Sequence, residues 1–245
     1  MRERRPLTSL SALPAADPAA DDEGYGGTII DTADIPGGGR LYLTRHDDGY
    51  EIMCGEEQLM SDWATVSERA LATQVCARLG DRLGRMLIGG LGMGFTLAAA
   101  VEAAPASASI VVAELVPAVV RWARGPLSHL FARSLGDPRV SVETRDVHDM
   151  IAERRDHFDA ILLDVDNGPD SLVCDGNERL YCGWGLRTAH HALRGGGILA
   201  IWSAYADATF SAALAAAGFS VDEVALCTRD VSGTHDHVIW LATKG

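Results

Sequence analysis

Three acidic residues in this chain stand where a ligand site is expected. Glu114, Asp146 and Asp164 each come at the end of a segment whose pattern predicts a β-strand. The carboxyl ends of parallel strands form the edge at which open α/β sheets bind ligands. These carboxylates are therefore predicted to lie along one edge of a sheet.

A glycine-rich segment precedes the three acids. Residues 86–97 read as an apolar strand, a turn and the start of a helix, and the turn contains Gly89, Gly90, Gly92 and Gly94. Glycine has no Cβ, so the backbone of such a turn can approach a ligand closely. Glycines also occur between strands and helices for structural reasons, but together with the acids they favour a nucleotide-type cofactor.

The elements that position these residues alternate along the chain. From residue 86 onward predicted strands alternate with helices, and two strands end the chain, which indicates an α/β fold. We expect a doubly wound, mostly parallel sheet with a C-terminal antiparallel hairpin. Residues 25–60 show short alternating strands and turns typical of a small β meander. Residues 1–24 show no periodicity and are predicted to be a mobile tail.

Composition limits the classes of function. The formal net charge is −13 with a pI of about 4.9, which argues against a nucleic-acid-binding surface. An acidic protein could bind a cationic substrate, although the charge could equally serve solubility alone. The five scattered cysteines match no standard zinc spacing, so no metal site is predicted. Reduced cysteines and the lack of a signal peptide or membrane span favour the cytoplasm.

Four segments, taken in order, resemble one known family. They are residues 89–94, 137–140, 158–164 and 192–197. Together with the final hairpin and the preceding meander, they are similar to spermidine synthases (polyamine aminopropyltransferases), which have the class I methyltransferase fold. The resemblance implies that residues 61–245 form a Rossmann-like domain that binds S-adenosylmethionine or its decarboxylated form. Related proteins also imply a homodimer.

The resemblance assigns roles to the acids. The glycine turn would hold the cofactor's amino-acid or ribose part, and Glu114 would accept the ribose hydroxyl hydrogens; its alternative role is a solvated strand-end acid. Asp146, with Val147 beside it, resembles the acid that binds the adenine amino group, and it could also cap the helix over 147–153. Asp164 is the expected catalytic residue, since its carboxylate could orient an amine or attract the cationic sulfonium. The Asp-Asn-Gly-Pro sequence after it predicts a turn in any case.

Two positions depart from the family pattern. Met93 stands where spermidine synthases have an acid within the glycine motif, and Asn167 stands where they have a second acid. Their gating Tyr-Gln pair is replaced near residues 66–68. A bound ammonium without charge partners costs several kcal/mol in desolvation. Met93 would also suit intact S-adenosylmethionine, whose own carboxylate an aspartate would repel.

These residues favour a transferase acting on a small acceptor, possibly an amine. The first hypothesis is methyl transfer from intact S-adenosylmethionine. The alternatives are an aminopropyltransferase using the decarboxylated cofactor and a cofactor-binding protein without catalysis. Tyr181, Trp202 and Tyr205 are candidates to line the acceptor pocket, and core packing is the alternative for Trp202.

Overall fold

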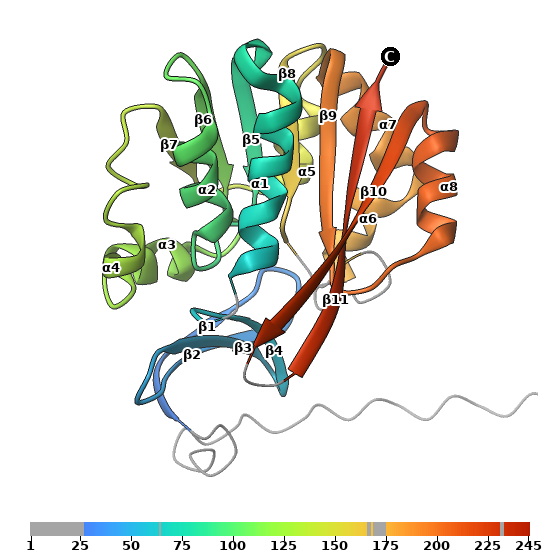
Figure 1. Cartoon of the computed structure of the whole chain (residues 1–245). Helices are drawn as coiled ribbons and strands as arrows, with labels where there is room; N and C mark the ends of the chain where they lie inside the picture. The colour runs from blue at the N-terminus through green and yellow to red at the C-terminus, as the bar shows by residue number, and fades with distance from the viewer. Residues whose placement is uncertain (1–26, 64, 166–167, 169–174, 231–232) are drawn as a thin grey trace, which may run out of the picture.

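The computed structural model describes residues 27–63, 65–165, 168, 175–230 and 233–245. The tail predicted over residues 1–24 therefore lies outside the described residues, as do Asp166 and Asn167. Within these ranges the chain forms two sheets, one at the N-terminus and one in the main domain (Figure 1).

The smaller sheet confirms the predicted meander. Its four antiparallel strands lie in chain order: β1 (Thr28–Asp34), β2 (Arg40–Arg45), β3 (Tyr50–Cys54) and β4 (Glu57–Ser61). Leu41 and Leu43 alternate along β2 and are buried, as is Ile52 opposite Leu43 on β3. Alternation of this kind gives the sheet one apolar face, which packs into the same core as the main domain.

The larger sheet has the predicted doubly wound topology. Its strand order is β10-β11-β9-β8-β5-β6-β7. Neighbours are parallel except at β11, which runs antiparallel to both β9 and β10. The strands are β5 (Arg85–Gly89), β6 (Ser109–Ala113), β7 (Val140–Glu143), β8 (Phe158–Leu163), β9 (Leu193–Ser203), β10 (Phe219–Asp230) and β11 (Gly233–Lys244).

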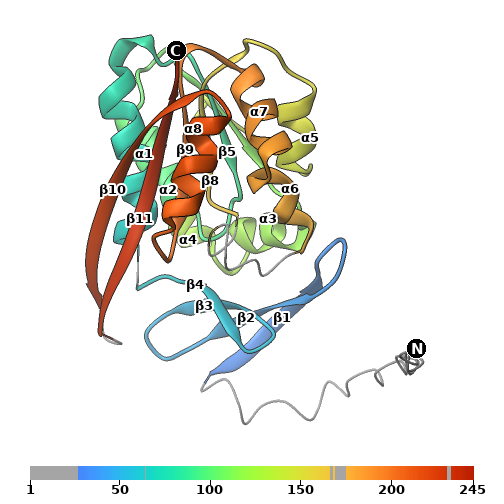
Figure 2. The same ribbon diagram turned by 90° about the vertical axis from the view of Figure 1, so that its right-hand side faces the viewer.

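Helices cover both faces of this sheet. They are α1 (Val66–Leu79), α2 (Phe95–Ala103), α3 (Pro117–Arg124), α4 (Ser128–Phe131), α5 (Val147–Ala152), α6 (Glu178–Tyr181), α7 (Gly183–Ala192) and α8 (Ala208–Ala216), with 3-10 turns at Gly80–Arg82 and Asp175–Asn177. Figure 2 shows α1 and α7 on opposite sides of the strands. Within the described ranges, no helix is long and apolar enough to cross a membrane.

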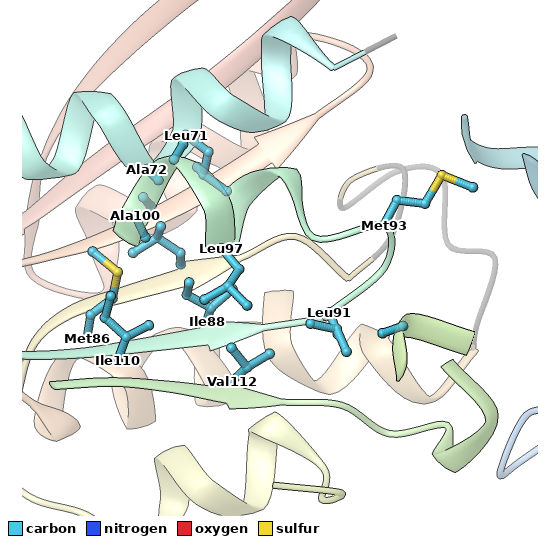
Figure 3. Close-up of a cluster of buried hydrophobic side chains, with 14 of the residues drawn as sticks. Leu71, Ala72, Met86, Ile88, Leu91, Met93, Leu97, Ala100, Ile110 and Val112 are labelled. Atoms are coloured by element: carbon cyan, nitrogen blue, oxygen red, sulfur yellow. The ribbon is translucent and has the colours of Figure 1, made fainter. Parts of the chain in front are cut away.

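Two hydrophobic clusters form the cores on the two faces. On one face, α1 and α2 contribute Leu71 and Leu97, which are buried together with Met86 and Ile88 of β5 (Figure 3). On the other face α5, α7 and α8 pack against β8 and β9. This double cover explains why β8 is buried along its whole length and reads as a continuous apolar run apart from Asp159.

The sequence pattern predicts a helix capped by Ser61 or Asp62 and a single helix over residues 178–193, and the structure differs at both places. The helix expected to be capped by Ser61 or Asp62 starts at Val66, because Ser61 still pairs with β3 and the Asp62 N–H donates to the Tyr50 carbonyl. The single helix expected over 178–193 is divided into α6 and α7. Cys182 between them has an extended backbone, which interrupts the helical hydrogen bonding.

The sheet topology creates a crevice at the carboxyl ends of β5 and β8. These two parallel strands are neighbours, yet the chain leaves β5 toward β6 and leaves β8 toward β9, on opposite sides. Ligands bind at such switch points in open α/β sheets. Figure 1 shows the four-stranded sheet below this edge, so it covers the crevice from the other side.

Candidate functional site

Two connected clefts lie between the four-stranded sheet and the edge of the larger sheet. The larger cleft encloses about 800 Å³ including its mouth, and the smaller cleft about 540 Å³. The two clefts share Leu59, Met60, Gly92, Asp164 and Val165, so they form one continuous site.

The glycine turn forms one wall of both clefts. Gly90 has φ +89° and its N–H donates to the Ala113 carbonyl at 2.9 Å. A Cβ on Gly90 would overlap the Asp164 carbonyl oxygen, and one on Gly92 would meet the Met60 sulfur. Glycine at both positions therefore lets three chain segments approach each other around the clefts. Gly89 and Gly94 do not line the larger cleft; Cβ atoms there would meet Val147 and Phe131.

Glu114 lies at the end of β6 and lines the larger cleft. Its side chain is buried, and its two oxygens accept the Leu91 N–H at 2.9 Å and the Val116 N–H at 2.8 Å. Burial raises the pKa of Glu114, while these backbone donors oppose the shift by stabilising the carboxylate. The sequence alternative of a solvated strand-end acid does not fit this burial. Glu114 nevertheless lines the cleft, so a ribose hydroxyl bound there could donate to its carboxylate.

Asp146 follows β7 and also lines the larger cleft, next to Val147. Its Oδ1 accepts the His148 N–H at 2.8 Å, so it caps α5 as the sequence allowed. Its Oδ2 forms an ion pair with Arg179 of α6, a partner that the sequence did not indicate. The capping role is thus present, and the adenine role remains a prediction for the same carboxylate.

Asp164 stands where both clefts meet. Its N–H donates to the Gly89 carbonyl at 3.0 Å, which fixes the residue beside the glycine turn. The Thr96 hydroxyl, in the first turn of α2, is 2.6 Å from Oδ2 of Asp164. Burial raises the pKa of Asp164, and this hydroxyl opposes the shift. The position is suited to contact with a reacting group, because it borders both the larger and the smaller cleft.

Glu68 is a site residue that sequence reasoning missed. It lies in the first turn of α1 and lines the smaller cleft with Asp164 and Met93. Burial, and then the nearby charge of Asp164, raise the pKa of Glu68 to about 7. An acid in the first turn of a helix is common for dipole reasons, so the pattern alone gave no signal of a cleft residue. The only hint was its place in the segment that replaces the gating pair of spermidine synthases.

The three aromatic residues predicted to line the acceptor pocket lie in different surroundings. Trp202 lines the smaller cleft at the end of β9. Tyr181 is buried in the hydrophobic core against Phe210, with ring centroids 6.0 Å apart, and it lines neither cleft. Tyr205 is 66% exposed and also lies outside both linings. The structure therefore brings one of the three candidates to the site.

The described lining of the site is mostly apolar, and its ionisable residues are all acids. Glu68, Glu114, Asp146 and Asp164 contribute carboxyl groups, and no Lys, Arg or His belongs to the described lining of either cleft. Arg179 approaches from outside, where it pairs with Asp146. Among the described residues, no three His, Cys, Asp or Glu side chains gather as a metal site. A cationic ligand would therefore meet complementary charge here.

Replacing Gly90 with alanine tests whether the turn is needed for binding. The added Cβ would strain a left-handed backbone by about 1–2 kcal/mol and displace the Asp164 segment. We expect lower stability and at least about a tenfold loss of affinity for methylthioadenosine, the nucleoside common to both cofactor forms. Thermal unfolding and calorimetric titration measure the two effects.

Gly80 provides the matched control for this substitution. It has φ +51° at the end of α1, and a Cβ there would meet nothing within 4 Å. Gly80→Ala should therefore lose stability from backbone strain but keep nucleoside affinity. Equal affinity in Gly90→Ala and Gly80→Ala would exclude a binding role for the turn.

We compared the sequence and the structure with known proteins. No protein-family model matches the sequence, and no curated protein sequence is significantly similar to it. Solved structures do match. A spermidine synthase in complex with the transition-state analogue AdoDATO superposes with a TM-score of 0.70 and 18% identity, over 89% of this chain and 74% of that one.

Two further solved spermidine synthase structures also superpose on this chain. Spermidine synthase from Thermotoga maritima gives a TM-score of 0.68 with 18% identity, over 89% of this chain and 73% of that one. A probable spermidine synthase from Corynebacterium glutamicum gives 0.63 with 14% identity, over 88% and 80%. Both alignments cover most of this chain. The chain therefore has the spermidine-synthase-like form of the class I methyltransferase fold, as the resemblance of its motifs predicted.

Proposed function

We propose that this protein is a transferase that binds decarboxylated S-adenosylmethionine in the larger cleft and transfers its aminopropyl group to an amine in the smaller cleft. The observation that carries the proposal is that every ionisable residue in the described lining of the two connected clefts at the glycine turn is an acid. Both the sulfonium donor and a protonated amine are cations. The likeness to spermidine synthases, one of them bound to AdoDATO, supports the same class of reaction.

The residues present fit such a donor. Gly90 and Gly92 line the larger cleft, and the lack of a Cβ lets the Asp164 and Met60 segments close around it. Glu114 offers lone pairs for ribose hydroxyls, and Asp146 with Val147 would contact the base. When bound, the donor supplies a carbon activated by the adjacent sulfonium, so that an amine nitrogen forms a C–N bond as the C–S bond breaks.

Asp164 is the residue that we assign to the reacting amine. It borders both clefts, so its carboxylate can hold the acceptor nitrogen toward the donor. The attacking amine must lose a proton, and Asp164 can accept it or pass it to water. Leu59, Met60 and Trp202 line the smaller cleft beside it, and a ligand packed against these apolar side chains would displace water and strengthen the electrostatic interactions. Correct placement of the two reactants supplies much of the rate enhancement in such a transfer.

Methyl transfer from intact S-adenosylmethionine is the second candidate. Met93 favours it, because this buried apolar side chain lines the smaller cleft where spermidine synthases are expected to have an acid. Against it, the intact cofactor has a carboxylate, and no described residue of the smaller cleft's lining is basic. The homodimer and the cytoplasmic location expected from the sequence stay predictions.

The nucleoside product distinguishes the two reactions. Purified protein is incubated with each donor and a panel of small amines, and the nucleosides are separated chromatographically. Aminopropyl transfer releases methylthioadenosine from the decarboxylated donor, and this is the result that we expect. Release of S-adenosylhomocysteine from the intact donor would instead establish methyl transfer.

A further inference from the structure

Glu68 is an acid that the mechanism above does not use. It comes from α1, whereas the other three acids of the site follow strands of the larger sheet. Its carboxyl group nevertheless lines the smaller cleft, together with Asp164, Met93 and Trp202. A partly buried carboxylate facing a second acid is unfavourable unless something compensates the charge.

The local hydrogen bonds hold the two acids together. The Ser67 hydroxyl donates to Oε2 of Glu68 at 2.8 Å. The buried Thr96 hydroxyl lies 2.6 Å from Oδ2 of Asp164 and 3.1 Å from the Glu68 carbonyl oxygen. A hydroxyl has one proton and can donate to only one of these acceptors.

The surrounding charges leave this pair of acids uncompensated. Asp164 is the charged group whose field acts on Glu68, and the effect is repulsive. Arg69, the next residue along α1, pairs with Glu102 of α2 instead. No described residue that lines the smaller cleft is basic. The cation that this arrangement needs must therefore come with the ligand.

We propose that Glu68 is a specificity-determining residue, whose carboxylate binds a primary ammonium group jointly with Asp164. This inference rests on the proposed function and adds the residue that recognises the ammonium. The ammonium could belong to the aminopropyl side chain of the donor or to the acceptor amine, because both are primary amines that extend from the reacting centre. In either case Glu68 replaces a carboxylate that Met93 does not provide.

Proton release gives this proposal a signature independent of turnover. With a pKa of about 7, Glu68 is about half protonated in the free protein at pH 7. A bound ammonium favours the ionised form, so binding should release roughly half a proton at pH 7. The release should disappear near pH 9, where Glu68 is already ionised. Calorimetry in buffers of different ionisation enthalpy measures it.

The test compares Glu68→Gln with the wild type and with Glu57→Gln, a control on the exposed part of β4. Three titrations are made: methylthioadenosine, decarboxylated S-adenosylmethionine, and putrescine in the presence of methylthioadenosine. We expect Glu68→Gln to bind methylthioadenosine normally, to bind one or both ammonium ligands about ten- to a hundredfold more weakly, and to release no proton. Weakening of the donor alone or of putrescine alone identifies the source of the ammonium.

The outcomes separate this proposal from the one on which it rests. If the wild type binds the ammonium ligands and Glu68→Gln binds them equally well, Glu68 has no role in specificity while the transferase proposal stands. If the wild type binds neither, the transferase proposal itself fails. Normal methylthioadenosine binding by Glu68→Gln shows that the variant is folded.

Discussion

Asp164→Asn should reduce turnover about 10²- to 10⁴-fold, the range typical of losing a general acid or base. Asparagine keeps an oxygen that can accept the Thr96 hydroxyl, so the local structure should persist. Because the nucleoside contacts are made by other residues, affinity for methylthioadenosine should change by no more than a few fold. Initial rates at saturating donor, with calorimetry for affinity, separate the two effects.

Asp149→Asn is the matched control for this variant. Asp149 lies on α5, its side chain is 57% exposed, and it lines neither cleft. Its substitution should leave both turnover and affinity unchanged. If Asp164→Asn retains full turnover, Asp164 does not contact the reacting amine, and the reaction centre must be elsewhere in the clefts.

Glu114→Ala should give the largest loss of cofactor affinity. The substitution removes the proposed acceptor of the ribose hydroxyls and leaves the Leu91 and Val116 N–H groups without their buried partner. Each unsatisfied group costs about 1–3 kcal/mol, so both binding and folding stability should fall. For binding we expect about 1–3 kcal/mol, measured with methylthioadenosine to exclude effects of the side-chain ammonium.

Glu143→Ala controls for the loss of a strand-end glutamate. Glu143 ends the neighbouring strand β7, and only its backbone carbonyl contacts the Glu114 N–H, so alanine keeps that bond. Its side chain is 44% exposed, and the variant should bind the nucleoside normally. Equal nucleoside affinity in Glu114→Ala and Glu143→Ala would refute the ribose role.

The ligand-binding edge of the larger sheet, at the carboxyl ends of its parallel strands, could be predicted from the sequence because local sequence patterns determine where each strand ends. The sequence marks the carboxyl ends of these apolar strands by Gly89, Glu114 and Asp164. Parallel pairing brings those ends to the same edge of the sheet. Asp146 could likewise be recognised as a helix cap from its residue type and position. These features depend on residues close in sequence, so the strand-end residues of the larger cleft could be predicted, whereas the wall that the four-stranded sheet contributes could not.

The smaller cleft depends on contacts between distant segments, which no local pattern describes. Glu68 reaches Asp164 only because α1 packs beside α2, and the Thr96 hydroxyl then lies between them. Tyr181 was a candidate for the acceptor pocket, but the break at Cys182 sets α6 apart from α7 and the ring packs on Phe210 in the core. Tertiary packing therefore decided which polar and aromatic residues face the ligand space.

The most direct test of the central claim is the relative affinity of the two cofactor forms. Purified wild-type protein is titrated calorimetrically with decarboxylated and intact S-adenosylmethionine, and with methylthioadenosine as the common reference. A carboxylate placed beside acidic side chains costs up to several kcal/mol, so the decarboxylated form should bind at least about tenfold more tightly. Equal or tighter binding of the intact form would contradict the aminopropyltransferase proposal and return methyl transfer, which Met93 favours, to first place.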